Sequence, residues 1–430
     1  MFLGISLVLR LTLTFALARI VSPDQLGVYS WSVTAFGIMS IVTSFGLEFF
    51  LIRKIPEFRN IQKNRVGSVI GHTQKQVKIH SLLCIAIILP ISYFSKFFFE
   101  GATQYNSELM VIILALPFAG YLSSYSTSLR ALDFPLTGQV LESILQTGIL
   151  LFMVLISLTV FSDSFSGDVR AFQLVGMFLI SWILSCIIAN HSFRMRIKVQ
   201  SYLEPSKKDI KEWRKDQFTI VSGILGWASL GRSDILLLAF LVSSSEVAAY
   251  FICIRIAEIL MFFSSVSYYV WGGELSNLIQ KNCLKQAQDA LRKSSQLCIA
   301  TTLIATCLAW AFAEEMLAFF NETYVEHVHI FRVALLIFFL KGSAGILNRM
   351  YYILGEQAFL AKVQWSLGLF LTACVLLTVP IYGLMGCIIS LAICEVTYFT
   401  IMATRLKIKF NFSISPIPVN FCFKSTGQIK

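Results

Sequence analysis

Arginines inside long apolar runs are the residues of this sequence that could do chemistry. Arg10 interrupts the first apolar run, and Arg232 interrupts a later one. A guanidinium group matches phosphate oxygens in bidentate fashion, so two arginines across a cavity could hold a pyrophosphate group. The alternative is that each arginine snorkels to the interface or pairs locally, for example Arg232 with Asp234.

Further ionisable residues lie in apolar surroundings and extend this set. Arg255 and Glu258 are three residues apart, on one helix face, and form either an internal ion pair or, for Arg255, a third cation for the same anionic group. Lys341 and Asp234 are secondary cavity candidates. A carboxylate buried at membrane depth could carry a coupling proton. The carboxylates considered for that role are Glu142, Glu258 and Glu395.

The composition defines the environment of these residues. The 430-residue chain is 56% hydrophobic and 14% charged, with a mean hydropathy of +0.73; soluble domains carry about 25% charged residues. Its repeated apolar runs of about 20 residues predict transmembrane helices. No basic region or small-residue cleavage site precedes the first run, so we expect no removable signal peptide.

We therefore expect an all-α polytopic membrane protein with about twelve transmembrane helices, because lipid requires every backbone polar group to be satisfied within the segment. The expected helices lie near residues 1–21, 27–52, 78–98, 107–130, 138–161, 171–193, 217–242, 247–273, 297–318, 328–349, 359–380 and 383–404.

An internal repeat divides these helices into two groups. The stretch 17–29 recurs at 238–250 with one constant offset, and at this offset Arg10 corresponds to Gly231, next to Arg232. The matching residues are Leu17, Ala18, Val21, Ser22 and Tyr29 with Leu238, Ala239, Val242, Ser243 and Tyr250. The repeat predicts two six-helix parallel repeats around a central cavity, related by an axis along the membrane normal.

The expected domains follow from this division: an N-terminal bundle, a basic cytoplasmic linker containing Pro205, a C-terminal bundle and a cytoplasmic tail. Their ranges are 1–193, 194–216, 217–404 and 405–430. Each half also has a long polar stretch after its second helix, 55–78 and 275–296. In the second stretch one apolar face predicts an interfacial amphipathic helix. That face contains Leu284, Ala287, Ala290 and Leu291.

The distribution of basic residues predicts the orientation. With both termini in the cytoplasm, most of the 35 Lys and Arg residues lie on the inner side, and the outer loops retain Lys96 and Arg170. The net charge of +11 is then explained by orientation and by anionic lipid headgroups, so we expect no nucleic-acid partner.

Signatures of enzymes and cofactor sites are missing from the sequence. It contains no Walker A, HExxH or GxSxG motif, and its cysteines do not have the spacing of a zinc site. We expect neither enzymatic activity nor a metal or cofactor.

Several stretches resemble a known family, the polysaccharide biosynthesis flippases, which include O-antigen or lipid-linked oligosaccharide flippases. This family belongs to the multidrug/oligosaccharidyl-lipid/polysaccharide exporter superfamily, with multidrug extruders and lipid II flippases. The resemblance rests on 17–30, 45–47, 51–54, 232–239 and 246–250. Relatives usually carry a short polar segment before the first helix, and the sequence leaves open whether Met1 is the true start.

The resemblance implies a function. Such a protein would move undecaprenyl-pyrophosphate-linked oligosaccharide repeat units, for O-antigen, lipopolysaccharide or another surface polysaccharide, from the cytoplasmic to the periplasmic leaflet of the bacterial inner membrane. Alternating access coupled to an ion gradient would drive it, and Arg10, Arg232 and Arg255 would bind the pyrophosphate. Its partners would be the polyprenyl-pyrophosphate-linked oligosaccharide, the lipid bilayer and polysaccharide polymerase machinery. The alternatives are a multidrug or cation antiporter of the same superfamily and a non-transporting membrane scaffold. The sugar, the coupling ion, the resting conformation and the oligomeric state stay open.

Overall fold

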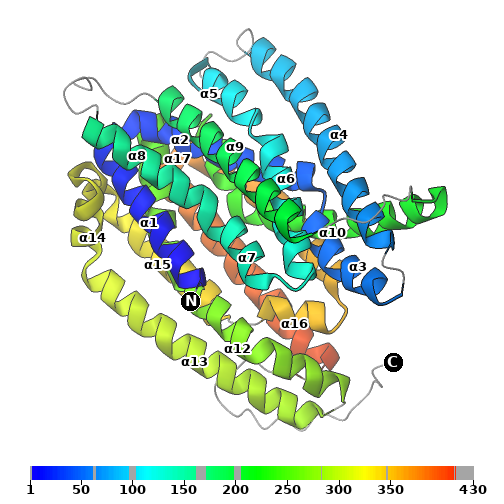
Figure 1. The fold of residues 1–430 in the computed structure, drawn as a ribbon. Coiled ribbons are helices and arrows are strands. Elements are labelled where there is room, and N and C mark those ends of the chain that lie inside the picture. The colour runs from blue at the N-terminus through cyan, green and yellow to red at the C-terminus, as the bar shows by residue number, and fades with distance from the viewer. Residues whose placement is uncertain are drawn as a thin grey trace. The chain divides into compact units, whose positions relative to one another are not determined.

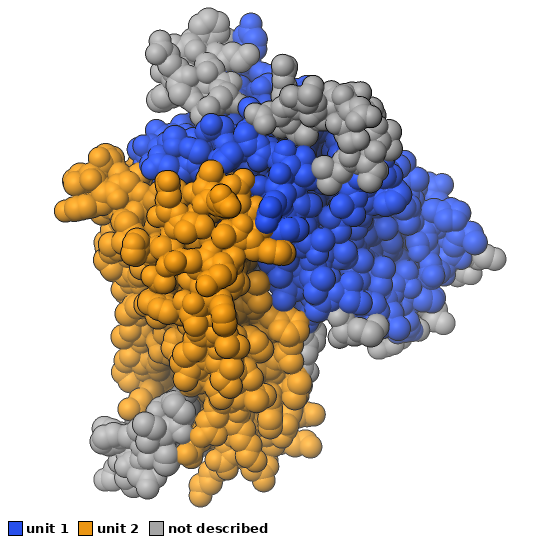
Figure 2. All heavy atoms as spheres, turned by 90° about the vertical axis from the view of Figure 1, so that its left-hand side faces the viewer, with its two compact units in different colours: residues 1–252 blue, residues 253–430 orange. Residues whose placement is uncertain are grey.

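The computed structural model describes most of the chain. The described residues are 2–61, 64–95, 103–160, 171–197, 205–281, 283–344, 347–410 and 412. Met1, Lys96 and Arg170, residues 198–204 of the expected linker and residues 413–430 of the expected tail lie outside them. The chain divides into two compact units, residues 1–252 and 253–430, which are coloured separately in Figure 2.

All regular structure in the described residues is helical, which confirms the expected fold class. Within them, ten helices are long and apolar enough to cross a membrane, or up to eleven if the bent pair Tyr105–Ile113 and Leu116–Ala131 is one span. The longest, α17 (Gln357–Phe410), contains a non-helical residue, Gly383, with φ of 56°.

Side-chain contacts show that α17 is a helical hairpin. The Thr378 hydroxyl lies 3.0 Å from that of Ser390, and the Gln364 amide donates to the Tyr398 hydroxyl at 3.3 Å. The two arms therefore run past each other on either side of Gly383, and α17 supplies both expected helices, 359–380 and 383–404. With the bent pair taken as one span, every one of the expected transmembrane segments has a helical counterpart.

The first unit begins with α1 (Phe2–Ile20), α2 (Pro23–Ser44) and α3 (Leu47–Ile61). The expected span 27–52 lies within one candidate membrane span, Pro23–Phe58. This span is not one continuous helix, because the chain breaks at Phe45 and Gly46, with φ of 45° and 71°. A β-carbon on Gly46 would lie 2.9 Å from Cγ2 of Ile220, so glycine fits both the backbone conformation and the space.

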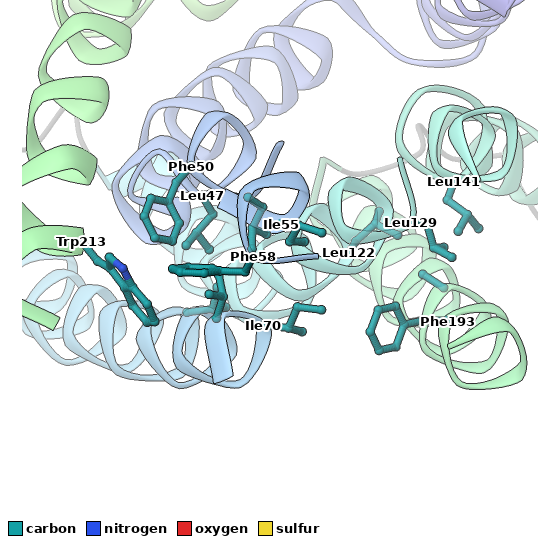
Figure 3. Packing of buried hydrophobic residues seen from close by; sticks show 14 residues of the cluster. Leu47, Phe50, Ile55, Phe58, Ile70, Leu122, Leu129, Leu141, Phe193 and Trp213 are labelled. Carbon is teal, nitrogen blue, oxygen red and sulfur yellow. The ribbon is translucent and has the colours of Figure 1, made fainter. Parts of the chain in front are cut away.

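The polar stretch 55–78 is largely helical in its described part, and α4 (Asn64–Ser95) begins well before the expected residue 78. One face of this stretch is apolar and buried in a cluster that joins several helices of the first unit (Figure 3). The cluster includes Phe50 and Phe58 of α3, Ile70 of α4, Leu122 and Leu129 of α6, Leu141 of the π-helical turn, Phe193 of α9 and Trp213 of α10. Burial of this face explains why a polar sequence continues the helix.

The remaining helices of the first unit follow the expected order (Figure 1). They are α5 (Thr103–Ile113), α6 (Leu116–Ala131), α7 (Pro135–Val140), a π-helical turn (Leu141–Leu145), α8 (Gln146–Val160), α9 (Ala171–Arg196), α10 (Lys207–Leu238) and α11 (Ser244–Ala257), whose last residues belong to the second unit. A proline in the first turn of α6 accounts for the 40° bend after α5, because proline cannot continue a preceding helix.

The expected linker 194–216 is partly helical. Its described ends belong to α9 and α10, and α10 starts with a capping box between Ser206 and Asp209. Trp213 packs on Phe50 and Phe58, with ring centroids 5.9 and 6.2 Å apart. The first part of α10 therefore packs on α3. The division of the chain into two six-helix bundles, which rests on the sequence repeat, stays a prediction.

The second unit contains the remaining helices. They are a 3-10 turn (Glu258–Leu260), α12 (Met261–Gln280), α13 (Leu284–Ala311), α14 (Ala313–Phe320), a second 3-10 turn (Glu322–His327), α15 (Val328–Ser343), α16 (Leu347–Ile353) and α17. The expected interfacial helix is instead the first part of α13, which runs on into the apolar span. Ala287, Ala290 and Leu291 are buried and Leu284 is 38% exposed, so packing within the protein covers most of this face.

Candidate functional site

Arg10 lies in the middle of α1, on an exposed part of the helix surface. The Thr14 hydroxyl donates to the Arg10 carbonyl at 2.8 Å, while Ala18, two turns further on, is buried. α1 packs on α2, on α8 and on the π-helical turn. The arginine side chain is therefore outside the packed core of the first unit.

Arg232 lies against the second helix of the first repeat. A β-carbon added to Gly37 of α2 would be 2.5 Å from Nη1 of Arg232, so the guanidinium group sits directly over this glycine. The side chain is half-buried. One turn along α10, the carbonyl of Leu236 accepts a hydrogen bond from Nε1 of Trp31 at 3.1 Å. The glycine that makes room for Arg232 could not be identified from the sequence, because nothing local marks it.

The two helices that carry the arginines of the first unit share a neighbour, α2. α1, which carries Arg10, and α10, which carries Arg232, both pack against α2. Arg255 belongs to the second unit.

Asp234 of α10 is buried and is hydrogen-bonded to Tyr250 of α11. Its carboxylate is 2% exposed and accepts a hydrogen bond from the Tyr250 hydroxyl at 2.6 Å. Tyr250 is fully buried, and Tyr29 and Trp31 are also buried. These aromatic side chains pack inside the first unit, and the Tyr250–Asp234 hydrogen bond joins α11 to α10.

The expected coupling carboxylates each form an ion pair. Arg255 and Glu258 are 2.8 Å apart at the end of α11, where the helix tightens into a 3-10 turn. This pair was one of the two interpretations of the sequence. Lys341 of α15 and Glu395 of α17 are 2.7 Å apart, and the Glu395 side chain is 6% exposed.

Glu142 occupies the π-helical turn between α7 and α8 and lies 2.7 Å from Arg130 of α6. Glu48 of α3 accepts a hydrogen bond from the Ser123 hydroxyl of α6 at 2.9 Å. The π-helical turn adds one residue to the helical repeat and aims Glu142 at α6. Sequence patterns gave no signal for this turn.

The two copies of the repeated turn meet each other, which the sequence did not predict. The Ser244 hydroxyl donates to Oδ1 of Asp24 at 2.8 Å. A β-carbon on Gly27 would lie 1.8 Å from the Ser244 carbonyl oxygen. The helix starts of α2 and α11 are therefore in backbone contact, which only glycine at residue 27 permits.

Among the described residues no group of three or more His, Cys, Asp or Glu side chains could hold a metal ion.

These features define a multi-pass membrane protein with helical spans and internal cations. Residues 2–272 match the sequence profile of the polysaccharide biosynthesis protein family, and the chain belongs to that family. Comparison with curated proteins finds no match.

Solved structures with the same fold include transporters and a flippase. An inward-facing multidrug resistance transporter of the MATE family, in the MOP superfamily, is 12% identical with a TM-score of 0.75, over 94% of both chains. The lipid II flippase MurJ in an inward closed conformation is 12% identical with a TM-score of 0.73, over 94% of this chain and 86% of that chain. A MOP superfamily transporter from Pyrococcus furiosus is 11% identical with a TM-score of 0.63, over 94% of this chain and 93% of that chain. These similarities establish the fold.

Proposed function

We propose that the protein is a flippase that moves undecaprenyl-pyrophosphate-linked oligosaccharide repeat units from the cytoplasmic to the periplasmic leaflet of the bacterial inner membrane. Both termini face the cytoplasm in this proposal. The repeat units serve O-antigen, lipopolysaccharide or another surface polysaccharide, and a polysaccharide polymerase uses them afterwards. Membership of the polysaccharide biosynthesis family supports this class of substrate.

The observation that carries the proposal is the position of Arg232. Its guanidinium group is half-buried within a transmembrane helix and lies over Gly37 of the first repeat. Carrying a pyrophosphate across the membrane exposes its negative charges to a medium of low dielectric constant, so a cation on the path must offset them. Arginine is suited to this task because its planar fork remains charged and can bind two phosphate oxygens at once.

Arg10 and Arg255 are the other proposed headgroup-binding residues, one in each compact unit. Arg10 is exposed on a helix that packs against α2, as α10 does. Arg255 is held by Glu258, and the arriving pyrophosphate exchanges with that carboxylate as the partner of the arginine. Lys341 and Asp234 do not bind the headgroup in this proposal, because Lys341 is paired with Glu395 and Asp234 is bonded to Tyr250.

Alternating access couples to an ion gradient through a buried ion pair. Lys341 and Glu395 are suited to this role, because protonation of the carboxylate would release the lysine inside the second unit. Arg130 and Glu142 offer the same chemistry in the first unit.

A multidrug or cation antiporter is the second candidate, since MATE transporters share the fold. An organic cation requires carboxylates that are available to it. Glu142, Glu258 and Glu395 are each paired with a basic residue of the chain itself, which favours an anionic cargo.

The proposal is tested in a strain that lacks the gene. Surface glycan and the pool of lipid-linked repeat units are measured with the wild-type gene, with Arg232→Ala and with an empty vector. Without the gene, the proposal expects surface glycan to be lost and repeat units to accumulate. The Arg232→Ala variant, at normal protein levels, should give the same result as the empty vector. Unchanged glycan together with altered drug sensitivity would transfer the assignment to the antiporter.

A further inference from the structure

The first unit has a groove whose lining includes neither Arg10 nor Arg232. It has a volume of about 750 Å³ and runs between α4 and the beginning of α10. Its apolar wall consists of Phe45, Ile79, Leu83 and Phe218, and its basic end consists of Arg214 and Lys215. The groove thus combines an apolar channel with a cluster of positive charge.

The walls of the groove are held in place by buried contacts. Gln76 of α4 and Gln217 of α10 exchange side-chain hydrogen bonds at 3.0 and 2.9 Å, and both residues are buried. Asp216 forms an ion pair with Arg53 of α3. The imidazole of His80 lies 4.8 Å from the ring of Phe45, measured between centroids. The basic end is therefore carried by a fixed helix and not by a loose loop.

The residues that line the groove include Arg214 and Lys215 and no carboxylate. Asp216 is paired with Arg53, and Asp209 with Arg65 at 3.3 Å. Arg214 makes no ion pair with any residue that the structure describes, and its side chain is exposed. The groove therefore has net positive charge at one end.

The apolar wall continues along α4 as an exposed stripe. Ile79, Leu83, Ile87 and Ile91 follow one another at helical spacing, and each is between 46% and 61% exposed. The stripe leads away from the basic end along the membrane-spanning part of α4. This arrangement matches an amphiphile with an anionic headgroup and an acyl chain.

We propose that this groove is a binding site for an anionic glycerophospholipid of the cytoplasmic leaflet. The phosphate group lies at Arg214 and Lys215, and one acyl chain follows the stripe from Ile79. A zwitterionic lipid fits less well, because its ammonium group would lie near the same two cations. Basic pockets between transmembrane helices at the cytoplasmic side are known to bind acidic lipid headgroups.

The test uses the full-length protein in nanodiscs that contain equal amounts of phosphatidylglycerol and phosphatidylethanolamine. Retained lipids are counted by native mass spectrometry. Wild type is expected to retain phosphatidylglycerol preferentially. Arg214→Gln with Lys215→Gln is expected to lower that retention by about 10- to 30-fold.

The matched control is Lys208→Gln with Lys211→Gln. It removes the same charge from exposed positions of the same helix that do not line the groove. Its retention should change by about twofold or less, because an exposed charge away from the site is screened by salt. Leu83→Trp fills the groove and keeps both cations, so it should also abolish retention.

Equal retention in wild type and in Arg214→Gln/Lys215→Gln would overturn the proposal. An equal loss in the Lys208/Lys211 control would overturn it too, since bulk charge would then explain the binding. Retention of an added undecaprenyl phosphate in place of phosphatidylglycerol would assign the groove to the polyprenyl carrier and would contradict a phospholipid site. If the double variant unfolds, Leu83→Trp alone decides.

Discussion

Gly27 and Ser244 are in direct backbone contact: a β-carbon on Gly27 would fall 1.8 Å from the Ser244 carbonyl oxygen. The two residues belong to the two copies of the repeated turn, 17–29 and 238–250. The hydrogen bond from Ser244 to Asp24 adds a polar contact at the same place. The two similar segments therefore also contact each other, and they join α2 to α11, the second helix of each expected repeat.

Gly27→Ala should break this joint. No rotamer can relieve a clash with a backbone oxygen, so α2 or α11 must move, and the free energy of unfolding should fall by about 1–3 kcal/mol. We also expect reduced transport, because α2 and α11 would lose the contact between Gly27 and Ser244. Thermal unfolding of the purified protein and surface glycan in cells measure the two effects.

Gly176→Ala in α9 is the matched control, because a β-carbon there has no atom within 4 Å. It should leave the protein unchanged or stabilise it by about 0.5–1 kcal/mol, as alanine is the better helix former. If the two alanine variants behave alike, the joint has no role in stability.

Gly37→Ala should displace the guanidinium group of Arg232 without unfolding the protein. The added β-carbon would lie 2.5 Å from Nη1, and a flexible side chain can move away. Because positioning matters strongly for charge recognition, we expect transport to fall by about tenfold. Gly231→Ala provides the control, since residue 231 is next to Arg232 and its β-carbon would meet no atom within 4 Å.

Arg232→Ala should reduce transport by about 10- to 100-fold at normal protein levels, because hydrogen bonds to charged groups are among the stronger ones. Arg232→Lys should recover only part of it if bidentate geometry matters. Full recovery with lysine would mean that charge alone is recognised.

The ion pair between Lys341 and Glu395 should respond to single and double changes differently. Glu395→Gln leaves a lysine without its partner in a buried position and should destabilise the second unit by about 3 kcal/mol. Lys341→Met combined with Glu395→Leu should cost much less, because no uncompensated charge remains. A double-mutant cycle by thermal unfolding measures the coupling, and additive effects would show that the pair is not coupled.

The same variants test ion coupling. If Glu395 carries the coupling proton, Glu395→Gln should make flipping insensitive to an imposed pH gradient. A variant that still responds to the gradient as wild type does would exclude Glu395 and direct attention to Glu142.

Glu356 should make stability dependent on acid pH. Hydrogen bonds from Lys409 and Arg405 lower the pKa of this carboxyl below its ordinary value of 4.5. A lowered folded-state pKa contributes stability that is present above pH 4.5 and is lost as the pH falls through the folded-state value. Thermal unfolding between neutral and acid pH should show this loss in wild type, and a smaller one in Glu356→Gln. Identical pH profiles of stability in wild type and Glu356→Gln would show that Glu356 and its two basic partners do not contribute to acid sensitivity.

The sequence allowed prediction of the class of protein and the positions of its spans. Hydropathy is a property of whole segments, and lipid permits few alternatives to a helix, so the helices of the described residues follow the expected order. The pairing of Arg255 with Glu258 could also be predicted from the sequence, because the two residues are three positions apart on one helix face.

Interactions between distant segments could not be predicted in this way. The fit of Arg232 over Gly37 and of Gly27 against Ser244 depends on how helices pack, and a glycine in a helix looks the same in sequence whether or not a neighbour touches it. The break at Phe45 and Gly46 and the π-helical turn around Glu142 are also set by tertiary packing. Helix propensity is too weak to reveal either.

The central claim is the transbilayer movement of a pyrophosphate-linked glycolipid, and reconstitution tests it most directly. Lipid-linked repeat units are incorporated into proteoliposomes, and the fraction that an added glycosidase can reach from outside is followed over time. The account predicts that wild-type protein exposes the inner-leaflet fraction and that Arg232→Ala protein leaves it protected, as in protein-free vesicles. Equal exposure with Arg232→Ala and wild type would contradict the headgroup site, and no exposure with wild type under any ion gradient would contradict the flippase.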